Sequence, residues 1–233
     1  MDQVTKITQW IKQVYGDRPA VIAVSGGVDS AVALTLLTRA IGKDKVTPVC
    51  LPYGDQDTSD SKIIIEWNAL SERMMEVNIG EIVDSIAKQL EAEQGSVRKG
   101  NMMARARMIV MFDLAKKVGA LVCGTENKSE HHLGYFTRFG DSASDVEPIA
   151  GLYKTQVWEM AKELGLPEIF YTKAPSAGLW EGQTDENERG FSYAEADKVL
   201  MGQIEGIDMS VVEKVQKMVK ANRFKLEVPY VIE

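Results

Sequence analysis

The sequence predicts an α/β fold: a doubly wound, mostly parallel five-stranded sheet with helices on both faces. Short apolar runs rich in β-branched residues alternate with longer segments whose apolar residues recur at helical spacing. Glycine follows several of the short runs, as expected where a strand turns into a helix. This βαβ alternation favours a parallel sheet that binds ligands at the carboxyl ends of its strands.

Length and composition indicate one globular domain over residues 1–233. A chain of 233 residues that is 45% hydrophobic can form one full core. The net charge is -7 and there is no block of Lys or Arg, which argues against nucleic acid or an anionic membrane as a partner. Neither a signal-like N-terminus nor a membrane-length apolar run is seen, so we expect a cytoplasmic protein. Cys50 and Cys123 each end an apolar run and are expected to be buried thiols.

The first part of the chain is expected to alternate between helices and strands. Residues 3–15 carry apolar side chains at helical spacing, and a Gly-Asp-Arg-Pro segment ends them. Residues 21–24 form a β-branched strand. The segment from about residue 29 to 41 is apolar on most sides, which indicates a helix buried against a sheet. Residues 46–51 form the second strand, closed by Pro-Tyr-Gly.

The middle of the chain continues this alternation. A polar loop from residue 55 leads into a helix that reaches residue 72, and residues 74–79 form a third strand. Helices are expected over residues 81–91 and 97–118.

Two further strands are expected over residues 120–123 and 146–149. Helices then follow over residues 155–164, 193–201 and 211–219.

Residues 175–190 have no periodicity and contain three glycines. A loop of this length is usually functional or disordered, and we expect a mobile lid here.

The turn after the first strand, Ser25-Gly26-Gly27, has the layout of an anion site. The glycines let backbone N–H groups converge, and the dipole of the following helix points into the turn. The loop lacks the Lys of a Walker A motif, whereas Asp29 offers a carboxylate suited to Mg²⁺. The alternative is an ordinary turn in which Ser25 or Asp29 only caps the helix.

Other strand-end loops also carry groups that suit phosphate or a metal. These are residues 125–130 and 138–145, with Lys154 close behind. Since the carboxyl ends of parallel strands share one edge, we expect the loops to converge there. Asp29 and Glu130 could then hold Mg²⁺ while basic side chains neutralise phosphate.

Each of these residues also has a purely structural interpretation. Glu130 could be an exposed helix residue, Arg105 a packed surface arginine and Lys154 a cation at a helix start. Arg105 and Arg107 are two positions apart on a helix, so they point in different directions and form no simple clamp. The pair His131-His132 is more typical of a helix surface than of a metal site for the same reason.

The string Ser25-Gly26-Gly27-Val28-Asp29-Ser30 resembles the pyrophosphate loop of the N-type ATP pyrophosphatases. That loop is shared with several synthetases and tRNA-modifying enzymes. The rest of the chain is similar to the ammonia-dependent NAD synthetases over nearly its whole length. The matching strings are Leu51-Pro52-Tyr53, Gly100-Asn101, Ala104-Arg105, residues 124–130 and 134–137, Gly140-Asp141, Asp145, and residues 152–155 and 175–186.

This resemblance implies an adenine nucleotide alpha hydrolase-like fold and a ligase that forms a C–N bond. The implied reaction amidates deamido-NAD to NAD with ammonia, and ATP is cleaved to AMP and pyrophosphate through an acyl adenylate. Mg²⁺ is the implied cofactor. Relatives of this kind are homodimers whose long helix near Arg105 lies at the subunit contact, so a homodimer is implied as well.

The resemblance also implies roles for individual residues. Asp29 and Glu130 would hold the metal, while Asp141, which would take a proton from ammonium, and Lys154 would be catalytic. The residues implied for deamido-NAD are Arg105, Arg138, Asp145 and Lys225. Those implied for ATP are Ala23, Val24, Ser25, Gly26, Gly27, Val28, Asp29, Ser30, Thr125, Lys154 and Ser176.

The chain departs from the family pattern at two positions. Arg138 stands where the family usually has Lys, which keeps the charge and changes the hydrogen-bond geometry. Phe224 stands where relatives typically have His, next to Lys225.

Free ammonia is the expected nitrogen donor. A glutamine amidotransferase domain would need a nucleophilic Cys with an acid/base partner and a few hundred further residues. Two alternatives remain. One is another N-type ATP pyrophosphatase that adenylates a different acceptor such as tRNA, and the acidic balance and the lack of a Cys-x-x-Cys pair argue against it. The other is an ATP-binding sensor without turnover, against which the presence of both Asp29 and Glu130 argues.

Overall fold

The computed structural model describes residues 2–93, 96–173 and 185–227, and within them the sheet is parallel throughout. Its strands are β1 (Ala20–Ala23), β2 (Val46–Cys50), β3 (Met75–Glu76) and β4 (Leu121–Cys123), in the order β3-β2-β1-β4. The predicted α/β fold with a parallel sheet is confirmed, with four strands in place of five.

Helices connect and cover the strands, and the described residues also contain three short 3-10 turns. The helices are α1 (Gln3–Tyr15), α2 (Val28–Ile41), α3 (Ser59–Trp67), α4 (Gly80–Gln89), α5 (Val97–Val118), α6 (Lys128–Leu133), α7 (Lys154–Glu163), α8 (Ile169–Thr172), α9 (Asp185–Arg189), α10 (Tyr193–Leu200) and α11 (Met209–Asn222). The 3-10 turns are η1 (Lys43–Lys45), η2 (Ser71–Arg73) and η3 (Arg223–Lys225). The loop expected over residues 175–190 ends in α9, and its part up to residue 184 lies outside the described residues.

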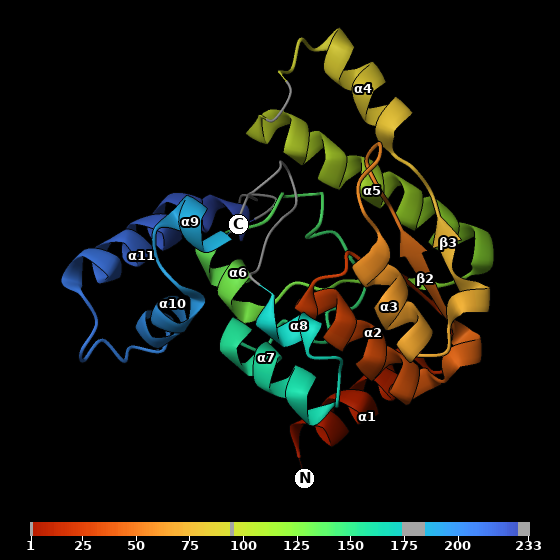
Figure 1. The fold of residues 1–233 in the computed structure, drawn as a ribbon, viewed down its shortest axis with the longest axis horizontal. Coiled ribbons are helices and arrows are strands. Elements are labelled where there is room, and N and C mark those ends of the chain that lie inside the picture. The colour runs from red at the N-terminus through yellow and green to blue at the C-terminus, as the bar shows by residue number, and fades with distance from the viewer. Residues whose placement is uncertain (1, 94–95, 174–184, 228–233) are drawn as a thin grey trace, which may run out of the picture.

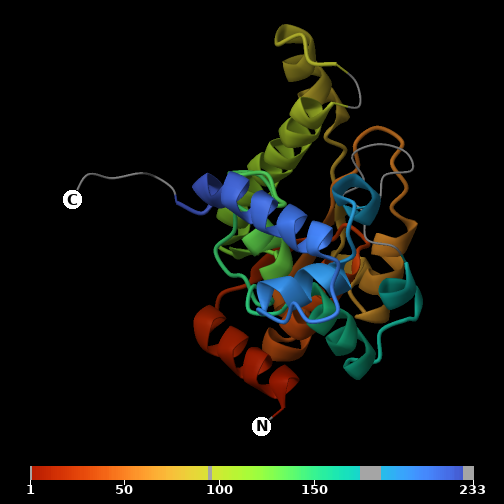
Figure 2. The same cartoon turned by 90° about the vertical axis from the view of Figure 1, so that its left-hand side faces the viewer.

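The two faces of the sheet carry separate hydrophobic cores. Successive residues of a strand point to opposite faces, and accordingly Ile22 packs with α1, α2, α3 and α7 whereas Val21 packs with α4 and α5. Figures 1 and 2 show α4 and α5 rising above the sheet while α1 lies at the opposite end of the molecule. The sheet is therefore covered on both sides, as the doubly wound prediction requires.

A third cluster lies beside α6. There Leu133 packs with α10 and α11 through Val199, Val212 and Val215. Figure 1 places α10 and α11 on the opposite side of the molecule from β2 and β3. Since this cluster closes over residues that follow β4, the C-terminal helices support the loops at the end of that strand. That residues 1–233 form one domain stays a prediction.

The strand order places the loops after β1 and β4 next to each other. The chain leaves β1 through α2 toward β2, and it returns through α4 and α5 to β4 on the other side of β1. Such a reversal of direction is where open α/β sheets bind their ligands.

The fifth strand expected over residues 146–149 does not form. Val146 makes only an isolated parallel bridge with Cys123, and Pro148 has no N–H for a ladder. Instead, the Glu147 side chain turns back and accepts hydrogen bonds from the Glu126 backbone (3.0 Å) and from Ser144 (2.7 Å). A Cβ at Gly124 would lie 1.9 Å from the Glu147 carboxylate, so this packing needs glycine there.

Cys50 and Cys123 are both free and buried, as predicted. Within the part of the chain that the structure describes, no helix is both long enough and apolar enough to span a membrane.

Glu147 makes stability depend on pH. Burial raises the pKa of its carboxyl from 4.5 to about 7, so the folded protein keeps a proton that the unfolded chain releases. The contribution of protonated Glu147 to the free energy of unfolding is fully present below pH 4.5, and it is lost as the pH rises toward 7. We predict that Glu147→Gln gains roughly 2 kcal/mol over the unmodified protein at pH 8 and nothing at pH 4.5. Urea unfolding at both pH values measures this, and an equal difference at both would contradict it.

Candidate active site

The loop between β1 and α2 forms an open turn at the sheet edge. Gly26 has a φ of 82°, and a Cβ there would lie 2.8 Å from the Cβ of Asp60. The turn therefore requires glycine. Gly27 caps α2 without a side-chain hydrogen bond, so the N–H groups of the first turn have no side-chain cap. Free N–H groups and the helix dipole together suit an anion.

Two serine hydroxyls fix the shape of this loop. Ser30 donates to the carbonyl of Gly27 (3.0 Å), and its oxygen lies 3.2 Å from that of Ser25. The Asp29 carboxylate accepts hydrogen bonds from Asn127 (2.9 Å) and Lys154. Asp29 thus binds partners on other elements, which favours the site interpretation over a simple cap.

Asn127 joins the loops that follow β1 and β4. This fully buried residue caps α6 by accepting a hydrogen bond from the Glu130 backbone (3.0 Å) and donates its amide to Asp29. The cap explains why the residues after β4, which were expected mainly as a strand-end loop, form the short helix α6. As a result Glu130 faces Asp29.

Lys154 lies between the two carboxylates. It is the first residue of α7 and only 2% exposed, and its ammonium is 2.5 Å from Asp29 and 3.1 Å from Glu130. Burial alone would lower the pKa of Lys154, but the two carboxylates outweigh it and raise the pKa. Burial, reinforced by Asp29 and opposed by Lys154, raises the pKa of Glu130 above its ordinary value. We call Asp29, Glu130 and Lys154 the carboxylate–lysine triad.

The triad also fits a magnesium ion. Asp29 and Glu130 both contact the Lys154 ammonium, so their carboxylate oxygens converge on one point. Mg²⁺ is typically held by one or two carboxylates together with phosphate oxygens and water. Among the described residues no three His, Cys, Asp or Glu side chains group as metal ligands. A metal ion bound at this place would therefore complete its coordination shell with oxygens of a bound substrate and of water.

A buried network of hydrogen bonds through Ser129 and Asp197 holds α6 and α7 together. Ser129 accepts a hydrogen bond from the Lys154 backbone (2.8 Å) and donates to Asp197. The Asp197 carboxylate, 1% exposed, also accepts from the backbone (2.9 Å) and hydroxyl (2.8 Å) of Thr155. Asp197 therefore fixes both the start of α7 and the residue before Glu130.

Tyr193 covers the triad from α10. Its hydroxyl lies 3.0 Å from Asp185 and 3.3 Å from Glu130, and the Lys154 ammonium is 5.0 Å from its ring centroid. The ring shields the ammonium from solvent, and the ammonium is attracted to the aromatic face. Sequence reasoning missed Tyr193 and Asp197, since each is one residue of an amphipathic helix.

Arg105 and Lys225 hold the loop that follows α6. The Arg105 guanidinium donates to the carbonyl of Arg138 (3.2 and 3.3 Å). The Lys225 ammonium donates to the carbonyls of Gly134 (2.6 Å) and Phe136 (2.9 Å). Arg105, Arg138 and Lys225, three of the residues expected to act together, thus meet at one loop.

A pocket of about 240 Å³ opens beside this loop. Its lining combines cations, one carboxylate and aromatic rings. The residues are Glu126, His131, Phe136, Arg138, Phe139, Ser142, Ala143, Lys225 and Leu226.

Asp141 and Asp145 lie at the same loop, outside the pocket lining. Asp141 accepts a hydrogen bond from the Thr137 backbone (2.7 Å), and although the residue is exposed, desolvation of its carboxyl by the surrounding chain raises its pKa. Asp145 accepts one from the Val122 backbone (2.8 Å), so it closes the edge of β4. Arg107 donates to the carbonyl of Leu51, away from Arg105, and the predicted divergence is confirmed.

Of the remaining residues predicted to bind ATP, three lie at the sheet edge and one lies outside the described residues. Ala23 ends β1 and Val24 follows it, while Thr125 lies one residue beyond Gly124 in the loop after β4, so all three lie at the edge that holds the triad. Ser176 falls outside the described residues.

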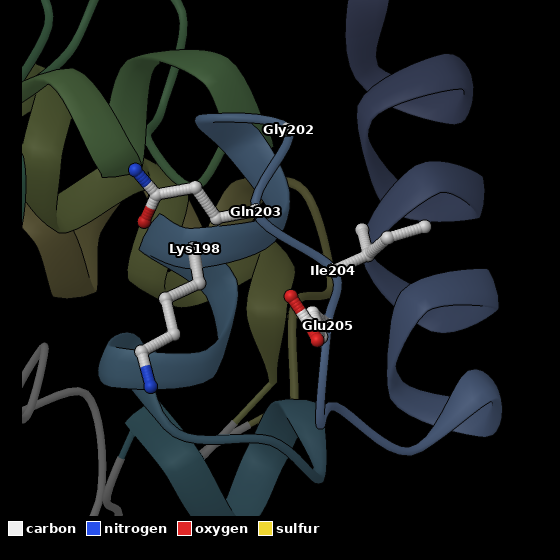
Figure 3. A pocket seen from close by; sticks show the side chains of 5 residues that line it. All are labelled: Lys198, Gly202, Gln203, Ile204 and Glu205. Carbon is white, nitrogen blue, oxygen red and sulfur yellow. The ribbon is translucent and has the colours of Figure 1, made fainter.

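Another hollow, of about 410 Å³, lies at the end of α10 and in the turn that follows it (Figure 3). Lys198, Gly202, Gln203, Ile204 and Glu205 line it. It is larger than the pocket beside Arg138, but no described strand ends there and none of the predicted site residues that the structure describes lines it. We therefore place the candidate site at the sheet edge.

Comparison with known proteins identifies the family of the chain. The family model described as NAD synthase matches residues 3–229. The NH(3)-dependent NAD(+) synthetase of Pyrococcus horikoshii is 42% identical, over 97% of this chain and 92% of that protein. The solved structure of NMN synthetase from Francisella tularensis aligns with a TM-score of 0.89 at 32% identity, over 99% and 97% of the two chains.

A second solved structure, the NH3-dependent NAD synthetase from Campylobacter jejuni, aligns with a TM-score of 0.84 at 29% identity over the whole of both chains. The match therefore extends over the sheet, the triad and the C-terminal helices together. On this evidence the chain belongs to the NAD synthase family.

Proposed function

We propose that the chain catalyses the ATP-dependent amidation of deamido-NAD by ammonia, giving NAD, AMP and pyrophosphate. The observation that carries the proposal is the carboxylate–lysine triad beside an anion-binding turn that has no lysine of its own. Family membership and the name of the Pyrococcus relative support it. The product pair AMP and pyrophosphate follows if the turn holds the outer phosphates of ATP.

The reaction needs a leaving group before it needs a nucleophile. A carboxylate is a poor acyl donor, so its oxygen first attacks the α-phosphorus of ATP, and pyrophosphate leaves. The N–H groups at residues 26–30 would bind that departing anion, and Lys154 would neutralise it from the α7 side. Ala23, Val24, Thr125 and Ser176 would complete the ATP site.

Asp29 and Glu130 would hold Mg²⁺ in this scheme. The bound ion would lower the charge repulsion between the triphosphate and the attacking carboxylate. Release of Asp29 and Glu130 from Lys154 would free the lysine for the phosphates, so one rearrangement serves both roles.

Asp141 would prepare the nucleophile. Only neutral ammonia attacks the acyl adenylate, and the raised pKa of Asp141 makes it a better acceptor for the ammonium proton than an ordinary aspartate. Arg105, Arg138, Asp145 and Lys225 would bind the dinucleotide. We further propose free ammonia as the donor, a homodimer with α5 at the contact, and a cytoplasmic location.

A second candidate is amidation of nicotinic acid mononucleotide to NMN by the same chemistry. The favouring observation is the TM-score of 0.89 with the NMN synthetase from Francisella tularensis. The substrates of the two candidate reactions carry the same reacting carboxylate. Deamido-NAD has an adenylate attached to the phosphate of its nicotinate nucleotide, whereas nicotinic acid mononucleotide has none.

The two candidates are separated by product analysis. We expect protein incubated with ATP, Mg²⁺, ammonium and deamido-NAD to form NAD and AMP in equal amounts. A parallel incubation with nicotinic acid mononucleotide tests for NMN. ADP in place of AMP would contradict the adenylation mechanism, and turnover of the mononucleotide alone would favour the second candidate.

Asp29→Asn tests the proposed metal ligand. We expect adenylate formation to fall about 100-fold or more, because an amide binds Mg²⁺ poorly and leaves the phosphates less well neutralised. Single-turnover release of pyrophosphate measures it, with Asp17→Asn on the exposed surface as the matched control. Full activity in the Asp29 variant would remove this residue from the metal site.

Asp197→Asn tests the support of α6 and α7. We expect kcat to fall about tenfold while KM for the acid substrate stays unchanged, because the network touches Lys154 and Ser129 but not the loop at residues 134–145. Steady-state kinetics measures both constants, and thermal melting reports the fold. A rise in KM as large as the fall in kcat would indicate general loosening instead.

A further inference from the structure

The guanidinium of Arg138 lies over two phenyl rings. It is 5.2 Å from the centroid of Phe139 and 5.5 Å from that of Phe224. Both rings are unusually exposed for phenylalanine, at 62% and 47%. A guanidinium stacked on aromatic rings is attracted through its faces, while the N–H donors around its edge stay available.

Within the described part of the chain the side-chain N–H groups of Arg138 have no protein acceptor. Its neighbours Arg105 and Lys225, in contrast, donate hydrogen bonds to backbone carbonyls. Arg138 is therefore the cation of this loop whose hydrogen-bonding edge is free. Two planar N–H pairs at a fixed orientation match the oxygens of a phosphate.

The backbone around Arg138 is held in a strained conformation. Phe139 has a φ of 61°, which is rare for a bulky residue. The next residue, Gly140, packs so closely that a Cβ would lie 2.9 Å from Thr137 and 3.0 Å from Ala104. Since the Arg138 carbonyl is also bound by Arg105, the loop cannot relax freely. Strain of this kind persists where the surroundings over-determine a site.

Phe224 reaches Arg138 from the other end of the chain. It belongs to η3, and the adjacent Lys225 anchors that turn to the carbonyls of Gly134 and Phe136. The pocket of about 240 Å³ opens beside the stack, with Arg138, Phe139 and Lys225 in its lining. Its ligand should therefore be an anion that also presents an apolar or planar part.

We propose that Phe139, Arg138 and Phe224 form a phosphate receptor for the acid substrate, in which Phe224 is a positioning residue that holds the guanidinium. The inference rests on the proposed function and deepens it. Both candidate substrates carry a phosphate on the ribose of their nicotinate nucleoside. The stack binds that phosphate and not the reacting carboxylate, because a carboxylate held in an ion pair would be a weaker nucleophile toward ATP.

The experiment measures equilibrium binding by calorimetry with two probes, nicotinic acid mononucleotide and nicotinic acid riboside, which lacks the phosphate. We expect Phe224→Leu to weaken mononucleotide binding about three- to fivefold, the size of an exposed cation–π contact. Phe224→Tyr keeps an aromatic face and should bind like the unmodified protein. In an Arg138→Met background Phe224→Leu should have no further effect. Trp10→Ala, which removes a comparably exposed ring on α1, serves as the control.

Three results would overturn the inference. They are an equal loss from Phe224→Leu with and without Arg138, an equal loss for the riboside and the mononucleotide, and no binding of the mononucleotide by the unmodified protein. Failure of the proposed function gives a different pattern. A protein that binds the mononucleotide through Arg138 but forms no amide from either acid substrate contradicts the function and supports the receptor.

Discussion

The buried ammonium of Lys154, held by Asp29 and Glu130, is the interaction on which the site depends. Each partner comes from a different element: α2, α6 and α7. Burying three charges is favourable only if they meet with good geometry, because each one unpaired would keep a large desolvation cost. The strand order β2-β1-β4 and the Asn127 bridge supply that geometry. The same convergence that satisfies Lys154 forms the place where we propose that a metal and phosphate bind.

The sheet edge divides into two regions with different supports. The region proposed for the nucleotide rests on strand ends and on the buried network of Ser129 and Asp197. The region proposed for the acid substrate is a loop whose carbonyls are held by Arg105 and Lys225, and Arg138 is the cation proposed to bind the substrate there. Adenylation has to bring two anions, the triphosphate and the substrate carboxylate, into contact. Separate sets of cations on rigid supports lower the repulsion between them without forming an ion pair with the reacting carboxylate.

The sequence could predict what depends on local pattern. The parallel sheet, the glycine turn and the meeting of Asp29 with Glu130 follow from strand and helix periods and from the shared edge of parallel strands. The predicted fifth strand does not form, because Pro148 has no N–H to donate and the Glu147 side chain folds back to the Glu126 backbone. Helix α6 was not predicted because Leu133 is its one apolar residue, which gives no periodicity, although Asn127 as a cap was a usable signal. Contacts such as Tyr193 over Lys154 come from packing between distant segments, which no local pattern encodes.

The most direct test is a crystal structure with Mg²⁺ and an ATP analogue whose α–β bridge is a methylene group, which adenylation cannot cleave. The account predicts the outer phosphates against the backbone of residues 26–30 and the metal on Asp29 and Glu130. A triphosphate bound in the pocket beside Arg138, with the triad undisturbed, would contradict it.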